Sequence, residues 1–183
     1  MIMLKTVVIV AVVFIVALLG FAATRPDSFR LQRSVVIEAP PDKVFALITD
    51  FKQWPKWSPW EKLDPNMKRT HSGTERGVGT VYAWDSPSKA GAGRMEIKEA
   101  VPSHKVTIQL DFIRPFAAQN TTEFTLQAQA QGNTNATQVT WAMSGANPYL
   151  AKLMQVFISM DSMVGKDFEE GLANLKRVAG GKE

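Results

Sequence analysis

The chain contains no cysteine among its 183 residues, which excludes disulfide bonds, thiolate metal sites and a cysteine nucleophile. It has only two histidines, His71 and His104, and each is expected at the edge of a strand beside a turn. We therefore interpret both as surface residues and predict no metal site. The sequence also lacks a nucleophile elbow, a glycine-rich phosphate loop and a paired-carboxylate pattern, so it indicates no cofactor and no catalytic residue.

Basic residues are never gathered into a run, although the formal net charge is +4 and the pI is about 9.4. This spread predicts a solvated surface and no nucleic-acid partner. It is compatible with a weak attraction to anionic lipid, because a basic residue near such a surface gains about 1 kcal/mol. A 45% hydrophobic and 21% charged composition is typical of a globular protein, and the length suits one domain and not two.

The longest hydrophobic run lies at the N-terminus, where residues 7–23 include no charged or strongly polar side chain. At a helical rise of ~1.5 Å per residue, this run nearly crosses a hydrocarbon core of ~30 Å. We predict a transmembrane anchor (or uncleaved signal) over residues 4–24, followed by a linker over 25–29. A cleaved signal peptide and a buried core helix are the alternatives. The run exceeds a usual signal core of ~7–15 residues, and residues 20–22 form a mediocre cleavage site.

The basic residues that flank this run do not favour a cytoplasmic N-terminus, because Lys5 and the amine on one side oppose Arg25, Arg30 and Arg33 on the other. We expect a single-pass protein of the cell membrane. Secretory-type N-terminal anchors commonly place the following domain outside the cytoplasm. We favour that side, and the opposite orientation stays open.

The rest of the chain contains short segments in which apolar and polar residues alternate with a period of two, which predicts strands. A hairpin loop is expected over residues 131–135. An antiparallel sheet of six to seven strands with one polar face needs a cover on the other face. The predicted strands are residues 31–38, 68–71, 79–85, 94–100, 104–113, 119–129 and 137–143.

Two helices are predicted to supply that cover. The first opens at Pro41 and closes at Asp50, and proline fits a first helical turn because its missing N–H has no partner there. The second is a single helix of about 28 residues, or ~40 Å. It begins at a capping Asn147, carries apolar residues at three- and four-residue steps, and stops at Gly180.

Three of the five tryptophans lie within seven residues, at positions 54, 57 and 60, where they are interleaved with Pro55 and Pro59. The prolines forbid an ordinary helix or a central strand, so the rings sit on an irregular, stiff segment. Large aromatic side chains in such a place plug the end of a core or line the mouth of a cavity.

Three segments together carry a resemblance to a known family; they read VVIEAPPDKVFALITD, WPKWSPW and MVGKDFEEGLANLK. In order and spacing they resemble the START / Bet v 1-like (SRPBCC) superfamily, in particular its bacterial polyketide cyclase/dehydrase-like branch. The resemblance spans residues 30–178 and leaves 179–183 as a tail. It implies an α+β helix-grip fold, in which a curved antiparallel sheet wraps around a long C-terminal helix and encloses a cavity. The family includes carriers of lipids and hydrophobic ligands, cyclases and co-chaperone-like modules, so the fold alone does not settle function.

The residues expected on the inner surface of that cavity are mostly aromatic or aliphatic. Methionines at several of these positions suit either an adaptable binding cavity or a plain core. The predicted ligand-binding residues are Trp57, Trp60, Tyr82, Trp84, Ile97, Ile108, Phe112, Phe124, Trp141, Met143, Met154, Phe157, Asp161, Val164 and Phe168.

Asp161 is the one charged residue on the apolar stripe of the predicted terminal helix. It can anchor the polar head of a ligand or act as a base with a raised pKa, although a helix-edge residue bonded to a neighbour is the simpler interpretation. Gly165, one turn further on, lowers helix propensity by ~1 kcal/mol relative to alanine, which indicates a close approach of a strand or a ligand. Asp85 is a second candidate base, with a turn residue as its simpler interpretation.

The sequence therefore favours a membrane-tethered domain that binds a hydrophobic small molecule or lipid in an internal cavity. Two alternatives stay open. One is a cyclase or hydrolase-like enzyme that uses a pocket carboxylate, and the other is a protein-interaction module of the co-chaperone type. An internal volume of several hundred Å³ would favour binding or catalysis, and a packed interior would favour the interaction module.

Overall fold

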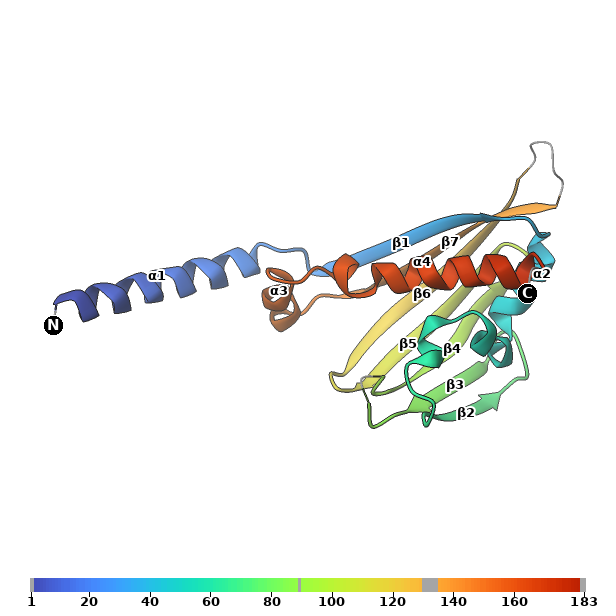
Figure 1. Ribbon diagram of the computed structural model, residues 1–183, viewed down its shortest axis with the longest axis horizontal. Helices are drawn as coiled ribbons and strands as arrows, with labels where there is room; N and C mark the ends of the chain where they lie inside the picture. The colour runs from blue at the N-terminus through green and yellow to red at the C-terminus, as the bar shows by residue number, and fades with distance from the viewer. Residues whose placement is uncertain (1, 89, 130–134, 182–183) are drawn as a thin grey trace.

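In the computed structural model, residues 2–88, 90–129 and 135–181 are described. They form a curved antiparallel sheet with helices on one face, and an N-terminal helix projects away from this domain (Figure 1). The helices are α1 (Ile2–Ala23), α2 (Pro41–Thr49), η1 (Phe51–Lys56), η2 (Pro59–Lys62), α3 (Tyr149–Gln155) and α4 (Met160–Ala179). Because α4 lies along one face of the sheet, the structure confirms the predicted helix-grip class.

The strands of the described chain are hydrogen-bonded in the order β1-β7-β6-β5-β4-β3-β2, and each neighbouring pair is antiparallel. They match the predicted strands, with ends that differ by at most three residues. The expected hairpin loop 131–135 and the end of the expected tail 179–183 fall largely on residues outside the described ranges. The strands are β1 (Ser28–Ile37), β2 (Lys68–Gly73), β3 (Thr80–Asp85), β4 (Ala92–Val101), β5 (Lys105–Arg114), β6 (Ala118–Gln129) and β7 (Ala136–Ala146).

The strand register aligns the inner-face residues in rows across the sheet. We call the end of the sheet where β1 begins and β7 ends the α1 end, because α1 leads into β1 there. Further from this end, Trp141, Phe124 and Val106 lie in one row and are almost completely buried. The row near the α1 end is less closed, since Phe29 and Leu110 are only half-buried there. Its members are Phe29, Gly145, Asn120, Leu110, Met95, Tyr82 and His71.

The tryptophan segment closes the C-terminal end of α2. The indole N–H of Trp54 donates to the carbonyl of Ile48 at 3.0 Å, and the indole N–H of Trp57 donates to the carbonyl of Leu47 at 3.3 Å. The last carbonyls of a helix have no partner inside it, so these two indoles satisfy them. A side chain with an apolar body and one polar edge does this while also filling the core.

The prediction of one uninterrupted terminal helix is wrong, because the chain forms α3, turns, and starts again as α4. Ser159 takes an extended conformation (φ −74°, ψ 154°) and its side chain accepts the backbone N–H of Ser162 at 3.1 Å. A serine in this role marks the start of a new helix. The break turns α3 away from the sheet, so residues 150–158 do not continue the inner stripe of α4.

Helix α1 is almost wholly exposed along its length. Its residues Met3–Ala23 are long and apolar enough to cross a membrane, judged by length and composition. The helix touches the domain at α3, where the hydroxyl of Tyr149 donates to the carbonyl of Leu19 at 2.9 Å.

Candidate functional site

The middle of the space between the sheet and α4 is filled by aromatic rings. Trp141 stacks on Phe124 with ring centroids 4.9 Å apart, and on Phe168 of α4 at 4.3 Å. Trp57 and Trp60 meet the edge of the same ring at 5.7 and 5.4 Å. This central cluster occupies the position where the sequence predicts the middle of a cavity.

One polar atom in this cluster has no partner. The indole Nε1 of Trp141 is buried and makes no hydrogen bond to any described residue. A buried donor without an acceptor is costly, so native structures usually supply a protein, water or ligand acceptor. The Trp141 N–H is therefore a buried donor for which the described residues supply no acceptor.

The interior is less closed towards the α1 end of the sheet. A set of half-buried apolar side chains surrounds the core there, contributed by η2, β3, β5 and α4. We call this set the half-buried margin; it consists of Trp60, Trp84, Leu110, Phe112, Met160 and Val164. Trp84 meets Phe112 edge to face at 5.9 Å. Asn120 is buried beside them, and its amide makes a weak contact with the Met143 sulfur at 3.9 Å.

A buried polar network lies beside the margin, between η2 and strands β2 and β3. The hydroxyl of Tyr82 donates to Glu61 Oε1 at 2.5 Å, and Arg69 Nε donates to Glu61 Oε2 at 2.7 Å. Burial, and then the adjacent Glu61 carboxylate, raise the pKa of the Tyr82 phenol well above its ordinary value. Arg69 also donates to the Glu61 carbonyl at 2.8 Å, so the network fixes η2, and with it Trp60, against the sheet.

The predicted ligand-binding residues fall into three groups. Buried residues are Trp57, Tyr82, Ile97, Ile108, Phe124, Trp141, Met143 and Phe168. Half-buried residues are Trp60, Trp84, Phe112 and Val164. Met154, Phe157 and Asp161 are exposed, so the prediction that they line the interior is wrong. Met154 and Phe157 lie on α3 and the turn after it, and the break before Ser159 directs them away from the sheet.

The carboxylates considered as catalytic bases are held in surface ion pairs. Asp161 accepts from Arg33 Nη2 at 2.5 Å, and Asp85 is paired with Arg114. The α4 carboxylate with a raised pKa is Asp167, through desolvation and then the nearby Glu170. Neither Asp161 nor Asp85 therefore supplies an interior base. Neither Glu61 nor Asp167 is predicted from the sequence. The partners of Glu61, Arg69 and Tyr82, meet it only in the folded chain, and the pKa of Asp167 is raised chiefly by burial.

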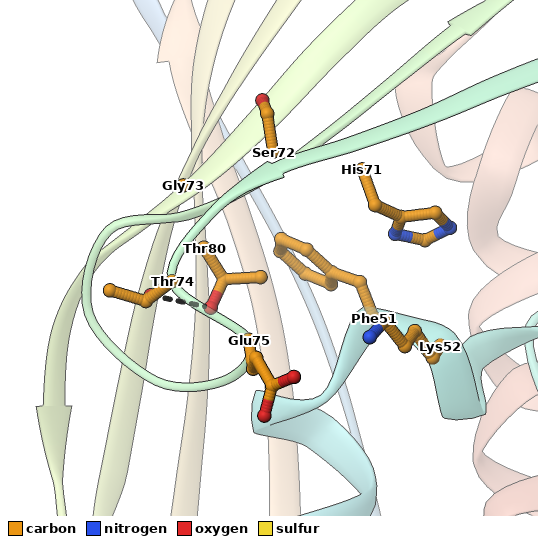
Figure 2. A pocket seen from close by; sticks show the side chains of 8 residues that line it. All are labelled: Phe51, Lys52, His71, Ser72, Gly73, Thr74, Glu75 and Thr80. Carbon is orange, nitrogen blue, oxygen red and sulfur yellow. Dashed lines mark hydrogen bonds between the residues drawn. The ribbon is translucent and has the colours of Figure 1, made fainter.

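Two surface pockets lie outside the space between the sheet and α4. One has a volume of about 110 Å³ and is formed by the start of η1 and the β2–β3 turn; Figure 2 shows the rings of His71 and Phe51 beside it. The other, of about 290 Å³, lies between α2 and the end of α4, next to Leu47 and Val178. Ligand pockets usually measure about 300–1,000 Å³, so the first is too small for a lipid. Among the described residues, no group of three or more acidic or histidine side chains is placed to hold a metal.

The chain belongs to the polyketide cyclase / dehydrase and lipid transport family, whose model matches residues 28–180. No curated protein sequence matches it. Solved structures show the same fold at low identity. They include protein CV1439 from Chromobacterium violaceum (17% identity, 85% of this chain and 99% of that one, TM-score 0.54). The Aha1 dimer from Colwellia psychrerythraea is similar at 16% identity, with 85% and 99% covered and a TM-score of 0.52.

The di-domain ARO/CYC protein StfQ from the steffimycin biosynthetic pathway has a TM-score of 0.63 at 10% identity. The match covers 85% of this chain and 51% of StfQ, about half of the di-domain protein. At this identity, the likeness establishes the fold alone.

Proposed function

We propose that this chain is a membrane-tethered domain that binds an apolar small molecule or lipid at the half-buried margin. The observation that carries the proposal is the position of the margin. Its apolar side chains are continuous with the buried core and lie towards the end of the sheet from which the apolar helix α1 extends. The family name, which includes lipid transport, supports the same class of ligand.

Binding would be driven by removal of apolar surface from water. At about 25 cal/mol per Å², a guest that buries about 200 Å² at the margin gains roughly 5 kcal/mol, which offsets part of the ordering cost. The rings of the central cluster limit how deeply such a guest enters. The buried Asn120 amide, which lies beside Leu110 in the row near the α1 end, is a polar group that would orient it.

A photoreactive lipid tests this proposal. The full chain is reconstituted in nanodiscs whose lipids carry a diazirine on one acyl chain, and the cross-linked peptides are mapped by mass spectrometry. We expect adducts on β5 near Leu110 and on α4 near Val164, in addition to adducts on α1. Val164→Trp would fill the margin and reduce the β5 adducts several-fold, whereas Val36→Trp, on the outer face of β1, would leave them unchanged.

The adducts on α1 provide an internal control, because they depend only on the tether. Adducts confined to α1 would reject the binding site and leave the tether intact. Absence of adducts from α1 would reject the tether. Equal β5 labelling in both tryptophan variants would show that the lipid reaches β5 without entering the margin.

The packed central cluster favours one second candidate, a protein-interaction module. A domain whose interior is filled by its own rings needs no small ligand, and its exposed surface then meets a protein partner. This candidate predicts no margin adducts at all, and a Val164→Trp variant that retains every activity of the parent protein.

A further inference from the structure

A second apolar surface of this protein lies on α3 and the turn that follows it. The exposed fractions of Leu150 and Phe157 are 62% and 70%, and Ile158 is also more than half exposed. From Asn147 to Met160 the sequence contains a single charged residue, Lys152. Its side chain is buried and its ammonium is paired with Asp27 at 2.5 Å, so the exposed surface of this segment carries no net charge from it. Scattered single apolar residues are ordinary on a protein surface, but a contiguous uncharged group indicates a contact site.

This surface is joined rigidly to the end of α1. The Asn147 backbone N–H donates to the carbonyl of Asp27 at 2.7 Å, and its side-chain amide donates to the carbonyl of Pro26 at 3.0 Å. With the Lys152–Asp27 pair, these bonds tie the start of α3 to the segment that connects α1 to β1. Helix α3 is therefore held in contact with the end of α1 (Figure 1).

The contact between α1 and α3 also fixes how far α3 lies from the end of the apolar helix. Tyr149 reaches the carbonyl of Leu19, four residues before the end of α1 at Ala23. At ~1.5 Å per residue, this carbonyl lies ~6 Å inside the end of the apolar helix. Interfacial helices bury their apolar face by ~5–10 Å, and tyrosine is enriched at this level of a bilayer.

We infer that α3 and residues 156–158 form a second membrane contact, lying in the interface of the same bilayer that α1 crosses. This inference rests on the proposed tether. It selects lipid over a protein partner because the apolar surface adjoins the apolar helix α1 and the one charged residue within 147–160, Lys152, is buried. Ile113 and Phe116, at the β5–β6 turn, are exposed at the same end of the sheet and extend the contact. The half-buried margin then lies close to the lipid.

The absence of native cysteine allows a direct test on the full chain. Single substitutions Phe157→Cys, Leu150→Cys, Val12→Cys and Val36→Cys are labelled with the fluorophore NBD and reconstituted in phosphatidylcholine vesicles. Lipids with a doxyl quencher at a shallow or a deep acyl position report the depth of each label. All four positions are exposed, so a label at any of them disturbs little packing.

We expect the labels at Phe157→Cys and Leu150→Cys to emit at shorter wavelength and to be quenched more by shallow than by deep doxyl. The Val12→Cys label should be quenched more by deep doxyl, and the Val36→Cys label should stay in water. If the Val12→Cys label is quenched but both α3 labels emit as they do in water, the second membrane contact is rejected and the proposed tether stands. Labels at α3 that are shielded from water but unquenched would indicate a protein or a second copy and would also overturn it. No quenching at Val12→Cys would remove the tether itself.

Discussion

The guanidinium of Arg33 on β1 lies directly over Gly165 of α4. It donates to Asp161 at 2.5 Å on one side and to Glu169 at 2.7 Å on the other, one helical turn before and after the glycine. A Cβ at position 165 would lie 2.7 Å from Arg33 Nη2, so the missing side chain makes room for the arginine. The close approach predicted at Gly165 is therefore made by a side chain of the sheet.

The two inner glycines of α4 should respond differently to alanine. A Cβ at Gly171 would meet the Trp141 ring at 2.8 Å and Pro59 at 3.2 Å, and both are held in the packed core. We expect Gly171→Ala to lower the free energy of unfolding by about 1–3 kcal/mol through overpacking. At Gly165 only the flexible ends of Arg33 and Asp161 must move. Alanine favours the helix by about 1 kcal/mol, so Gly165→Ala should stay within about 1 kcal/mol of the parent. Urea unfolding of both variants checks this, and equal losses would contradict it.

The buried tryptophans Trp57 and Trp141 provide a matched test of the unpaired indole. Each loses the same volume on change to phenylalanine, but only Trp57 donates a hydrogen bond to a described residue. We expect Trp57→Phe to destabilise the fold by about 1 kcal/mol more than Trp141→Phe. Chemical denaturation measures the difference. Equal costs would mean that the Trp141 N–H has an acceptor, such as a bound water.

Stability should fall at alkaline pH because of Tyr82. Its folded-state pKa is raised above the ordinary value of 10.0, so the folded state holds this proton more tightly than the unfolded state does. The free energy of unfolding is then unaffected by this group below pH 10 and decreases as the pH rises above it. In a Tyr149→Phe background, Tyr82 is the sole tyrosine, and near-ultraviolet absorbance should show tyrosinate only on unfolding. Tyrosinate that forms near pH 10 in the folded protein would contradict the assignment.

The break in the terminal helix depends on Ser159. Ser159→Ala removes the side-chain acceptor of the Ser162 N–H and should cost about 0.5–2 kcal/mol. Ser162→Ala is the comparison, because it keeps the Ser162 backbone N–H that Ser159 caps and removes only the bond from the Ser162 hydroxyl to the Ser159 carbonyl at 2.8 Å. Thermal unfolding of the two variants compares them. A larger effect at position 162 would show that the cap does not define the start of α4.

Alternation along the chain was sufficient to predict the sheet, as β5 shows. Val106 and Ile108 are buried while Thr107 and Gln109 on the other face are not, so the pattern and the burial coincide. The terminal helix was predicted less well, because apolar residues continue at helical spacing through Phe157 and Ile158. A short polar residue that caps a helix is hard to separate from one on its surface when both neighbours are apolar.

The polar network was not predictable from the sequence. Glu61, Arg69 and Tyr82 lie on three different elements, and only the pairing of β2 with β3 brings them together. Asp161 shows the opposite case. Its place on an apolar stripe suggests an interior role. Arg33, more than a hundred residues earlier in the chain, instead holds it at the exposed edge of α4.

The bonds from Asn147 and Lys152 to Pro26 and Asp27 restrict rotation at the joint between α1 and the domain, residues 24–27. Such a joint would present one fixed side of the sheet to whatever surface holds α1. Every copy of the domain would then lie at the same distance from that surface and at the same angle to it, independently of its neighbours. Lengthening this joint by a few residues would therefore alter access to the domain without changing any residue inside it.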